Sequence, residues 1–390
     1  MKNNYRKYFL ASDSIRMFLC AMLVPYVAVF LLYAVYSVIA SSINMKIDDF
    51  NQTLPVIMIN AVFMQVCFVA IYFTFVHKRR INFAPASKLN VKPNAWMLAI
   101  CICIGFAFMW FTSPTIGLFE EGLKGIGCNI KSNLGFELNS AGTIIFAILC
   151  LGILPAFIEE FIFRGAILQG LRKYGNCFAI VMSALLFMLI HGNIQQTIYQ
   201  FAFGILAGYV VIKTGSIWTS IIIHAINNVF IITMQSIQTC IGVDEVATKI
   251  DAFYVIRAVI YLVVLALIIY LGIKLLNKVK NRIENQENEQ NNAENVGKMS
   301  KNLENTATTQ EKSAIQQENS TSVQSADLNA VGQTNDEDNE IELEKQFAEI
   351  KFKQGFAGFM RDGSIKKEGL TGFFIAFAIT VINTISMFLS

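Results

Sequence analysis

The sequence predicts an all-α fold, a polytopic membrane bundle of about eight transmembrane helices followed by a disordered polar linker and a C-terminal apolar helix. Three observations support this prediction. The 390-residue chain is 54% hydrophobic and only 15% charged, with a mean hydropathy of +0.50, which is rare for a water-soluble domain. Apolar stretches close to membrane-spanning length recur along it, and Lys and Arg gather in every second loop between them.

The predicted spans follow one another with short loops. Because about 20 apolar residues cross a bilayer as a helix, three spans are expected in an N-terminal region, residues 1–141, at 15–40, 54–76 and 95–111. A core region, residues 142–280, holds five more, at 142–163, 177–191, 197–212, 217–236 and 252–275. The shorter stretches of the core can span only as members of a packed bundle.

Basic residues orient these spans. Short cytoplasmic loops carry an excess of Lys and Arg, and the N-terminal segment and every second loop are basic, whereas the intervening loops are acidic or mixed. All eight crossings therefore agree on one topology, with the N-terminus in the cytoplasm. The frequent Asn, Ile and Lys suggest a bacterial source, so we expect an integral protein of a bacterial plasma membrane.

The composition changes after the last of these spans. Residues 281–340 are rich in Asn, Gln, Glu, Ser and Thr, and cannot bury enough apolar surface to fold, which predicts a disordered linker. Residues 341–390 combine an amphipathic segment, two lysines and the apolar run 370–389. This run is long enough for a ninth span with an external C-terminus; the alternative is a helix lying on or against the bundle.

Ionisable residues inside a predicted span are the first candidates for chemistry, because charges at membrane depth are costly. Glu159 and Glu160 are adjacent in the fourth span, and Arg164 lies one helical turn after Glu160, where an ion pair forms easily. Pro155 interrupts the helix ladder just before them. A purely structural Glu–Arg pair would explain Glu160 and Arg164, but it leaves Glu159 unexplained.

Two of the three histidines lie in other spans. Phe187 and His191 share a helix face at i and i+4, as do His224 and Asn228. Each His alone is better explained by an interhelical hydrogen bond. Two of them, together with a carboxylate pair on a third helix, favour a site. Between them, Gly204 and Gly208 form a small-xxx-small pattern that permits close helix packing.

Hydrolysis is the chemistry that such groups can perform. A carboxylate withdrawn from water holds a proton more readily, which suits a general base acting on water near an imidazole. His and Asn donors can stabilise an oxyanion. A divalent metal such as Zn is the other option, with Glu160, His191 and His224 as its ligands. The absence of an H-E-x-x-H motif makes the metal signal weak.

Taken in order, Glu-Glu-x-x-x-Arg, Phe-x-x-x-His and His-x-x-x-Asn resemble the motifs of the CPBP family of intramembrane proteases, which includes type II CAAX prenyl endopeptidases and bacterial Abi proteins. The turn from Lys213 to Trp218 resembles it too, and the resemblance covers about residues 142–230. It implies that Glu159 and Glu160 include the catalytic base, that His191 positions water, that His224 and Asn228 stabilise the oxyanion, and that Arg164 is structural. Both metal-dependent and metal-independent mechanisms are argued for this family.

The leading hypothesis is therefore a CAAX-type intramembrane endopeptidase. Eukaryotic relatives remove a tripeptide from prenylated proteins, and bacterial members are linked to peptides such as bacteriocins. The alternative is a non-catalytic bacteriocin-immunity or scaffold protein of the same family. A proton-coupled carrier is disfavoured because no internal repeat is visible. The expected partners are a peptide or membrane-protein substrate and the lipid bilayer, with no nucleic acid; the sequence leaves the oligomeric state open.

Overall fold

The computed structural model describes residues 5–128, 137–241, 250–316, 343 and 345–389. Over these residues the regular structure is helical, with one isolated bridge between Arg6 and Ile81. The chain forms two compact units. The first combines Met1–Gly272 with Lys345–Ser390, and the second is Ile273–Glu344. The predicted all-α class is confirmed.

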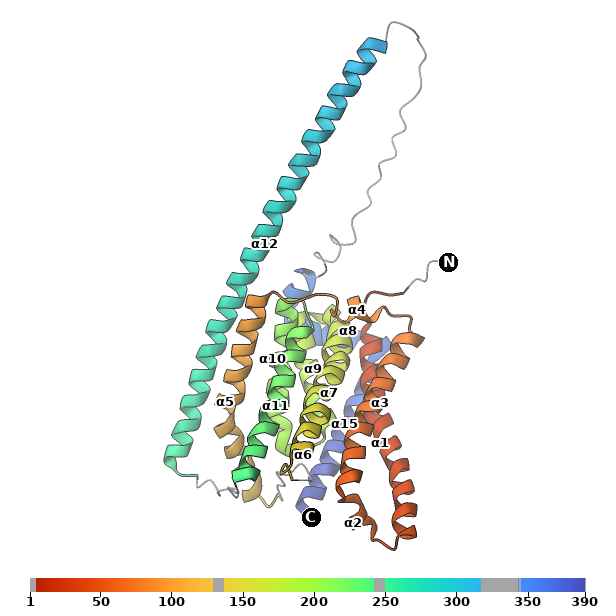
Figure 1. Ribbon diagram of the computed structural model, residues 1–390, viewed down its shortest axis with the longest axis vertical. Coiled ribbons are helices and arrows are strands. Elements are labelled where there is room, and N and C mark those ends of the chain that lie inside the picture. Colours follow the sequence, from red (N-terminus) through yellow and green to blue (C-terminus); the bar gives the residue numbers. More distant parts are fainter. Residues whose placement is uncertain (1–4, 129–136, 242–249, 317–342, 344, 390) are drawn as a thin grey trace. The chain divides into compact units, whose positions relative to one another are not determined.

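The N-terminal region contributes three long apolar helices, which Figure 1 colours from red to orange. They are α1 (Ala11–Ser42), α3 (Leu54–Lys78) and α5 (Ala95–Gly125), joined by the short helices α2 (Ile47–Asn51) and α4 (Phe83–Ala86). Each long helix includes the span predicted for it and extends beyond it. Helix α5 begins at an N-cap, Asn94, whose side chain accepts hydrogen bonds from two backbone N–H groups of the first turn.

The helix that carries the two glutamates is a composite rod over residues 141–174. Its sections are α6 (Ala141–Phe146), η1 (Ala147–Ile153), α7 (Leu154–Glu160), η2 (Phe161–Leu168), α8 (Gln169–Leu171) and η3 (Arg172–Tyr174). Sections η1 and η2 are π-helical, with wider turns that occur often at functional sites. Pro155, at the start of α7, has no N–H for the α-helical ladder and clashes with the preceding turn. The regular section with the glutamates is thus bounded by two irregular ones.

Three further helices surround this rod: α9 (Asn176–His191), α10 (Thr197–Thr214) and α11 (Trp218–Ile241), with the short η4 (Ile194–Gln196) before α10. Helices α9 and α10 approach closely at Gly204, where an added Cβ would lie 2.8 Å from Cα of Ala184. At Gly208 an added Cβ would lie 3.4 Å from Ile180. The predicted close packing through Gly204 and Gly208 is confirmed.

The described residues include seven helices long and apolar enough to cross a membrane, and α9 is a shorter apolar helix of 16 residues. All of the predicted spans are helical. The last of them lies in α12 (Ala252–Gln316), which continues far beyond residue 275. The structure has residues 281–316 as a continuation of α12, whereas the composition predicts a disordered linker from residue 281. This stretch lacks Pro and contains many Glu and Gln residues, which are good helix formers. Residues 317–340 of the linker lie outside the described residues.

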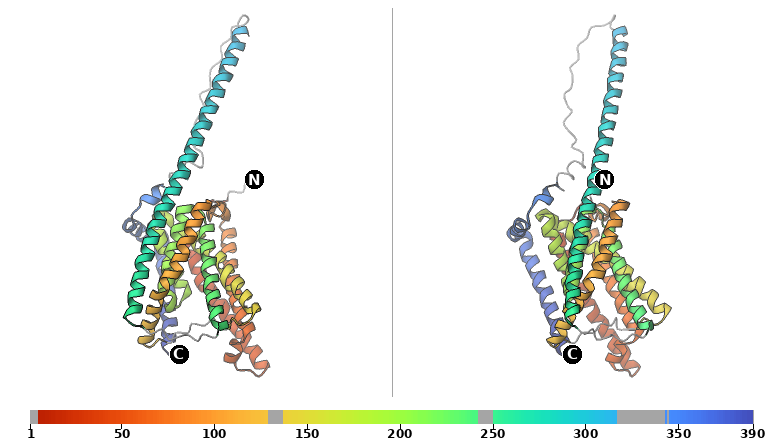
Figure 2. Two further views of the ribbon diagram at one scale, coloured as in Figure 1. Left: turned by 60° about the vertical axis from the view of Figure 1, so that its left-hand side comes forward. Right: turned by 90° about the vertical axis from the view of Figure 1, so that its left-hand side faces the viewer.

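The C-terminal segment (residues 345–389) is part of the first unit and packs against its other helices through α14 (Phe352–Arg361) and α15 (Gly363–Leu389). Gly355 of α14 meets the backbone at Tyr174, and Phe359 packs edge-on against the Tyr174 ring, 5.6 Å between centroids. Helix α15 contacts α1 and α9 and runs lengthwise beside the bundle (Figures 1 and 2). Whether α15 is a ninth span stays a prediction.

Candidate active site

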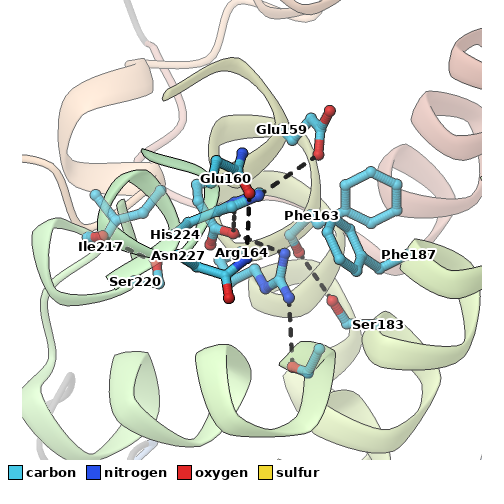
Figure 3. A network of polar contacts seen from close by, with 12 residues as sticks. Glu159, Glu160, Phe163, Arg164, Ser183, Phe187, Ile217, Ser220, His224 and Asn227 are labelled. Atoms are coloured by element: carbon cyan, nitrogen blue, oxygen red, sulfur yellow. Dashed lines mark hydrogen bonds and ion pairs between the residues drawn. The ribbon is translucent and has the colours of Figure 1, made fainter. Parts of the chain in front are cut away.

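Three helices bring the predicted residues to one place. Helix α7 supplies Glu159 and Glu160, α9 supplies Phe187 and His191 at its C-terminal end, and α11 supplies His224. Figure 3 shows the imidazole of His224 lying between the two carboxylates. Residues far apart in sequence thus meet as expected, and the two neighbouring glutamates occupy different environments.

Glu160 is completely enclosed. Its Oε1 accepts a 2.8 Å bond from Nη1 of Arg164, and both side chains have 0% exposure. The same Oε1 lies 3.0 Å from Nδ1 of His224. Arg164 also donates through Nη2 to the carbonyl of Gly204, at 3.4 Å. The predicted i,i+4 pair is present, and it ties α7 to α10 and α11 as well as to its own helix.

Glu159 faces the opposite nitrogen of the same imidazole. Its Oε2 lies 4.0 Å from Nε2 of His224, too far for a direct hydrogen bond, and its side chain is 14% exposed. Glu159 also interacts electrostatically with His191 and Arg164. In contrast to Glu160, this carboxylate has no cation bonded to it among the described residues. The two neighbouring carboxylates therefore differ in both burial and bonding partners.

The hydrogen bonds settle which ring nitrogens carry protons. Nδ1 of His191 lies 2.8 Å from the carbonyl oxygen of Phe187, which can only accept, so Nδ1 donates. Nδ1 of His224 faces Glu160, whose negative charge the Arg164 guanidinium balances, so this nitrogen donates too. In the neutral form of either ring, Nε2 then holds a lone pair that can accept a hydrogen bond from water.

Phe187 is the apolar wall shared by these groups. Its ring is fully buried, 4.8 Å from the His191 ring and 5.8 Å from the His224 ring. The Arg164 guanidinium carbon lies 4.3 Å from its centroid, close enough for a cation–π contact. The expected neighbourhood of Phe187 and His191 is present.

Asn228 lies one turn after His224 on α11, as predicted, but its contacts lead elsewhere. Its Nδ2 donates to the carbonyl of Gly152 in η1 at 3.3 Å, and its Oδ1 accepts from Nδ2 of Asn227 at 3.2 Å. The hydroxyl of Tyr199 donates to Oδ1 of Asn227. Neither Asn227 nor Tyr199 was predicted from the sequence. The adjacent pair Asn227-Asn228 inside an apolar span could have marked Asn227 as a candidate site residue. Nothing in the sequence around Tyr199 marks it in this way.

Two more residues near the site were not foreseen. The ring of Phe203 from α10 lies 5.1 Å from that of His224 and 6.4 Å from that of Phe187. Ser220, one turn before His224, is fully buried and donates to the carbonyl of Ile217 at 3.0 Å. The turn before α11 is held in place by Trp218, whose Nε1 donates to the carbonyl of Leu89 at 2.9 Å.

The set predicted for a metal, Glu160, His191 and His224, does not fit one. Within the described part of the chain, no group of three or more His, Cys, Asp or Glu side chains is arranged to hold a metal ion. The physical reason is visible at Glu160, whose Oε1 is already occupied by a guanidinium and an imidazole. A cation there would be repelled by Arg164 at close range.

Comparisons with known proteins point to one family. Residues 141–230 match the family described as type II CAAX prenyl endopeptidase Rce1-like, which is the stretch that carries the three motifs. A Bacillus subtilis (strain 168) protein named "Putative membrane peptidase YdiL" is 26% identical over 141 residues, which are 34% of this chain. The match spans 58% of that relative's length. No solved structure matches the chain.

Proposed function

We propose a function from the premise that residues 141–230 of this chain belong to the CAAX/CPBP family of membrane proteases. The protein is an intramembrane endopeptidase that hydrolyses a peptide bond with water activated by Glu159. The observation that carries this proposal is the position of His224, with Nδ1 bonded to Glu160 and Nε2 facing Glu159. One carboxylate is thereby committed to holding the ring, and the other is available for chemistry.

The gap between Glu159 and His224 suits a water molecule. Two hydrogen bonds of about 2.8 Å that meet at one water with a tetrahedral angle span about 4.5 Å, and the two side chains are 4.0 Å apart. Such a water donates one proton to Glu159 and the other to Nε2 of His224. Attack of its oxygen on a carbonyl carbon transfers the first proton to Glu159, which acts as the general base.

Glu160 orients His224, as a buried carboxylate orients the imidazole of a catalytic triad. The carboxylate fixes the tautomer of the ring and stabilises the imidazolium that forms when Nε2 is protonated. The proton that Glu159 takes from the water passes to Nε2, whose N–H then donates to the oxyanion and gives the proton to the departing amine; the second water proton stays on the new carboxyl group. His191 borders the attacking water from α9, and Asn228 supplies a second donor to the oxyanion. Arg164 keeps Glu160 charged and takes no part in bond making.

The substrate follows from the environment of the site. All of these residues lie in apolar helices, so the scissile bond belongs to a peptide or a protein already associated with the membrane. The basic loops support a cytoplasmic N-terminus, and the frequent Asn, Ile and Lys support a bacterial source. The matching family is named for prenylated CAAX substrates, and a lipid-modified peptide end is the first class to test.

The test compares cells that express the wild type with cells that express Glu159→Gln, by quantifying membrane-associated peptides with mass spectrometry. Peptides released by the enzyme should disappear in the variant, because an amide cannot accept the proton. Glu121→Gln, an equivalent change at an exposed carboxylate paired with Lys124, is the matched control and should leave the peptides in place. If both variants give the wild-type peptide pattern while remaining folded, a non-catalytic immunity or scaffold role replaces this proposal.

A further inference from the structure

The amide of Asn228 belongs to a chain of three hydrogen bonds that joins α10, α11 and η1. The hydroxyl of Tyr199 donates to Oδ1 of Asn227, Nδ2 of Asn227 donates to Oδ1 of Asn228 at 3.2 Å, and Nδ2 of Asn228 donates to the carbonyl of Gly152 at 3.3 Å. Asn227 is only 4% exposed. The chain therefore ends at a backbone carbonyl on the rod that carries Glu159.

The direction of this chain is fixed by its last member. A backbone carbonyl can only accept, so the atom of Asn228 that meets Gly152 must be its amide nitrogen, and the oxygen must face Asn227. Asn227 then has to present its own nitrogen to Asn228, and its oxygen remains for the Tyr199 hydroxyl. Each amide is held in one of its two orientations. The nitrogen of Asn228 spends one N–H on Gly152 and keeps the second for another acceptor.

The ring of Tyr199 is also linked to His224, the other proposed oxyanion donor. It stacks on Phe203 with 6.4 Å between centroids and an angle of 8° between the rings. Phe203 in turn lies against His224, 5.1 Å between ring centroids. Tyr199 thus reaches Asn228 through its hydroxyl and His224 through its ring, and both connections run through buried side chains.

We infer that Tyr199 and Asn227 are positioning residues that hold the Asn228 amide with its N–H toward the oxyanion. This inference rests on the proposed function, because it gives Asn228 the role assigned there. Without the Tyr199 hydroxyl, Oδ1 of Asn227 loses its donor, and Asn227 is no longer held against Asn228. The Asn228 amide is then held by Gly152 alone and can move out of the position in which its free N–H reaches the oxyanion.

The probe is the peptide whose release Glu159→Gln abolishes, synthesised with a fluorophore and a quencher on either side of the cleaved bond. Losing an oxyanion donor costs about 100- to 1000-fold in kcat. Tyr199→Phe, which only misaligns one, should lower kcat about tenfold and leave KM unchanged. Asn227→Leu should lower kcat at least as much. Tyr209→Phe, the same change on the same helix outside this chain, should match the wild type.

A second measurement separates positioning from general damage. If Tyr199 acts through Asn228, adding Tyr199→Phe to Asn228→Ala should cause no further loss of kcat. A further tenfold loss in that background would overturn the inference, as would a Tyr199→Phe enzyme with the wild-type kcat. Either result is distinct from a failure of the proposed function, in which Glu159→Gln itself retains cleavage.

Discussion

The segment with the motifs and the C-terminal segment are both held by carboxylate–arginine pairs, but in opposite environments. In the first, Glu160 and Arg164 are 2.8 Å apart with 0% exposure on either side. In the second, Arg16 of α1 meets Glu368 of α15 at 2.9 Å, and the two side chains are 40% and 37% exposed. By geometry alone the exposed pair would rank higher, because Arg16 donates to both oxygens of Glu368, whereas Arg164 donates to one oxygen of Glu160.

The difference in burial gives them different roles. A buried ion pair cannot lose one member without leaving an uncompensated charge, which is strongly destabilising. An exposed pair contributes little, and salt screens it. The core helices are therefore locked together by interactions that cannot be lost singly, whereas the C-terminal segment is held by several weak contacts. Those contacts include Lys173 and Tyr174, each 2.7 Å from Asp362.

The most damaging single change to the core is predicted to be Arg164→Met. It leaves the Glu160 charge buried without its guanidinium, at a cost of about 3–5 kcal/mol. Thermal unfolding in detergent, followed by size-exclusion chromatography, should show a large fall in Tm. The double variant Glu160→Gln with Arg164→Met removes both charges and should recover a substantial part of that loss. A single variant as stable as the wild type would contradict the view of a locked core.

Substituting a glycine in each region tests how much each region depends on a close backbone contact. Gly204→Ala should destabilise the whole protein by about 1–3 kcal/mol, because the new methyl group forces α9 away from α10 at Ala184. Gly355→Ala meets a tighter contact, 2.0 Å from the carbonyl oxygen of Tyr174. It should nevertheless release only α14. Limited proteolysis should therefore cut near α14 faster in Gly355→Ala with an unchanged Tm, and equal losses of Tm in the two variants would abolish the distinction.

An intermediate effect is expected at Asn383, where the C-terminal segment reaches the site. Its Nδ2 donates at 3.1 Å to the carbonyl of Gly192, the residue directly after His191. Asn383→Leu removes a bond worth about 1 kcal/mol and should slow cleavage of the fluorogenic peptide about fivefold. Thr371→Val is the control, since its hydroxyl donates to the carbonyl of Lys367 in its own helix. An unchanged rate in Asn383→Leu would mean that α15 does not influence the His191 region.

The smallest effect is predicted for Arg16→Gln, which breaks the exposed pair. It should lower stability by no more than about 1 kcal/mol. The difference in Tm from the wild type should shrink as NaCl rises from about 50 to about 500 mM, because the Debye length shortens. The corresponding difference for Arg164→Met should not change with salt. A salt-independent effect of Arg16→Gln would indicate that the pair is shielded from solvent.

Local spacing in the sequence predicted the local contacts of the site well. The Glu160–Arg164 pair and the packing of Phe187 on His191 both follow from i,i+4 positions on one helix. The spans followed from hydropathy, since each helix must satisfy its backbone groups within itself. Gly204 and Gly208 predicted a close approach because glycine has no side chain to keep the two helix backbones apart.

The remaining features depend on packing between distant residues. The face of α7 that meets α11 decides which of the two glutamates is enclosed. The sequence does not show this, because the two residues are identical neighbours. Tyr199 lies 28 residues from Asn227, so no short motif joins them. The helix over 281–316 was missed because polar composition was taken to exclude order, although helix propensity needs no buried face.

The π-helical sections around the glutamates imply that the helix responds differently to single-residue deletions at different positions. Each π turn holds one residue more than an α turn, so deleting one residue from η1 or η2 allows an ordinary helix to form there. A deletion inside the α-helical section α7, which has no such extra residue, would instead rotate one end of the rod by about 100° relative to the other and turn Glu159 away from His224. Loss of one codon in frame should therefore be tolerated better in η1 or η2 than in α7.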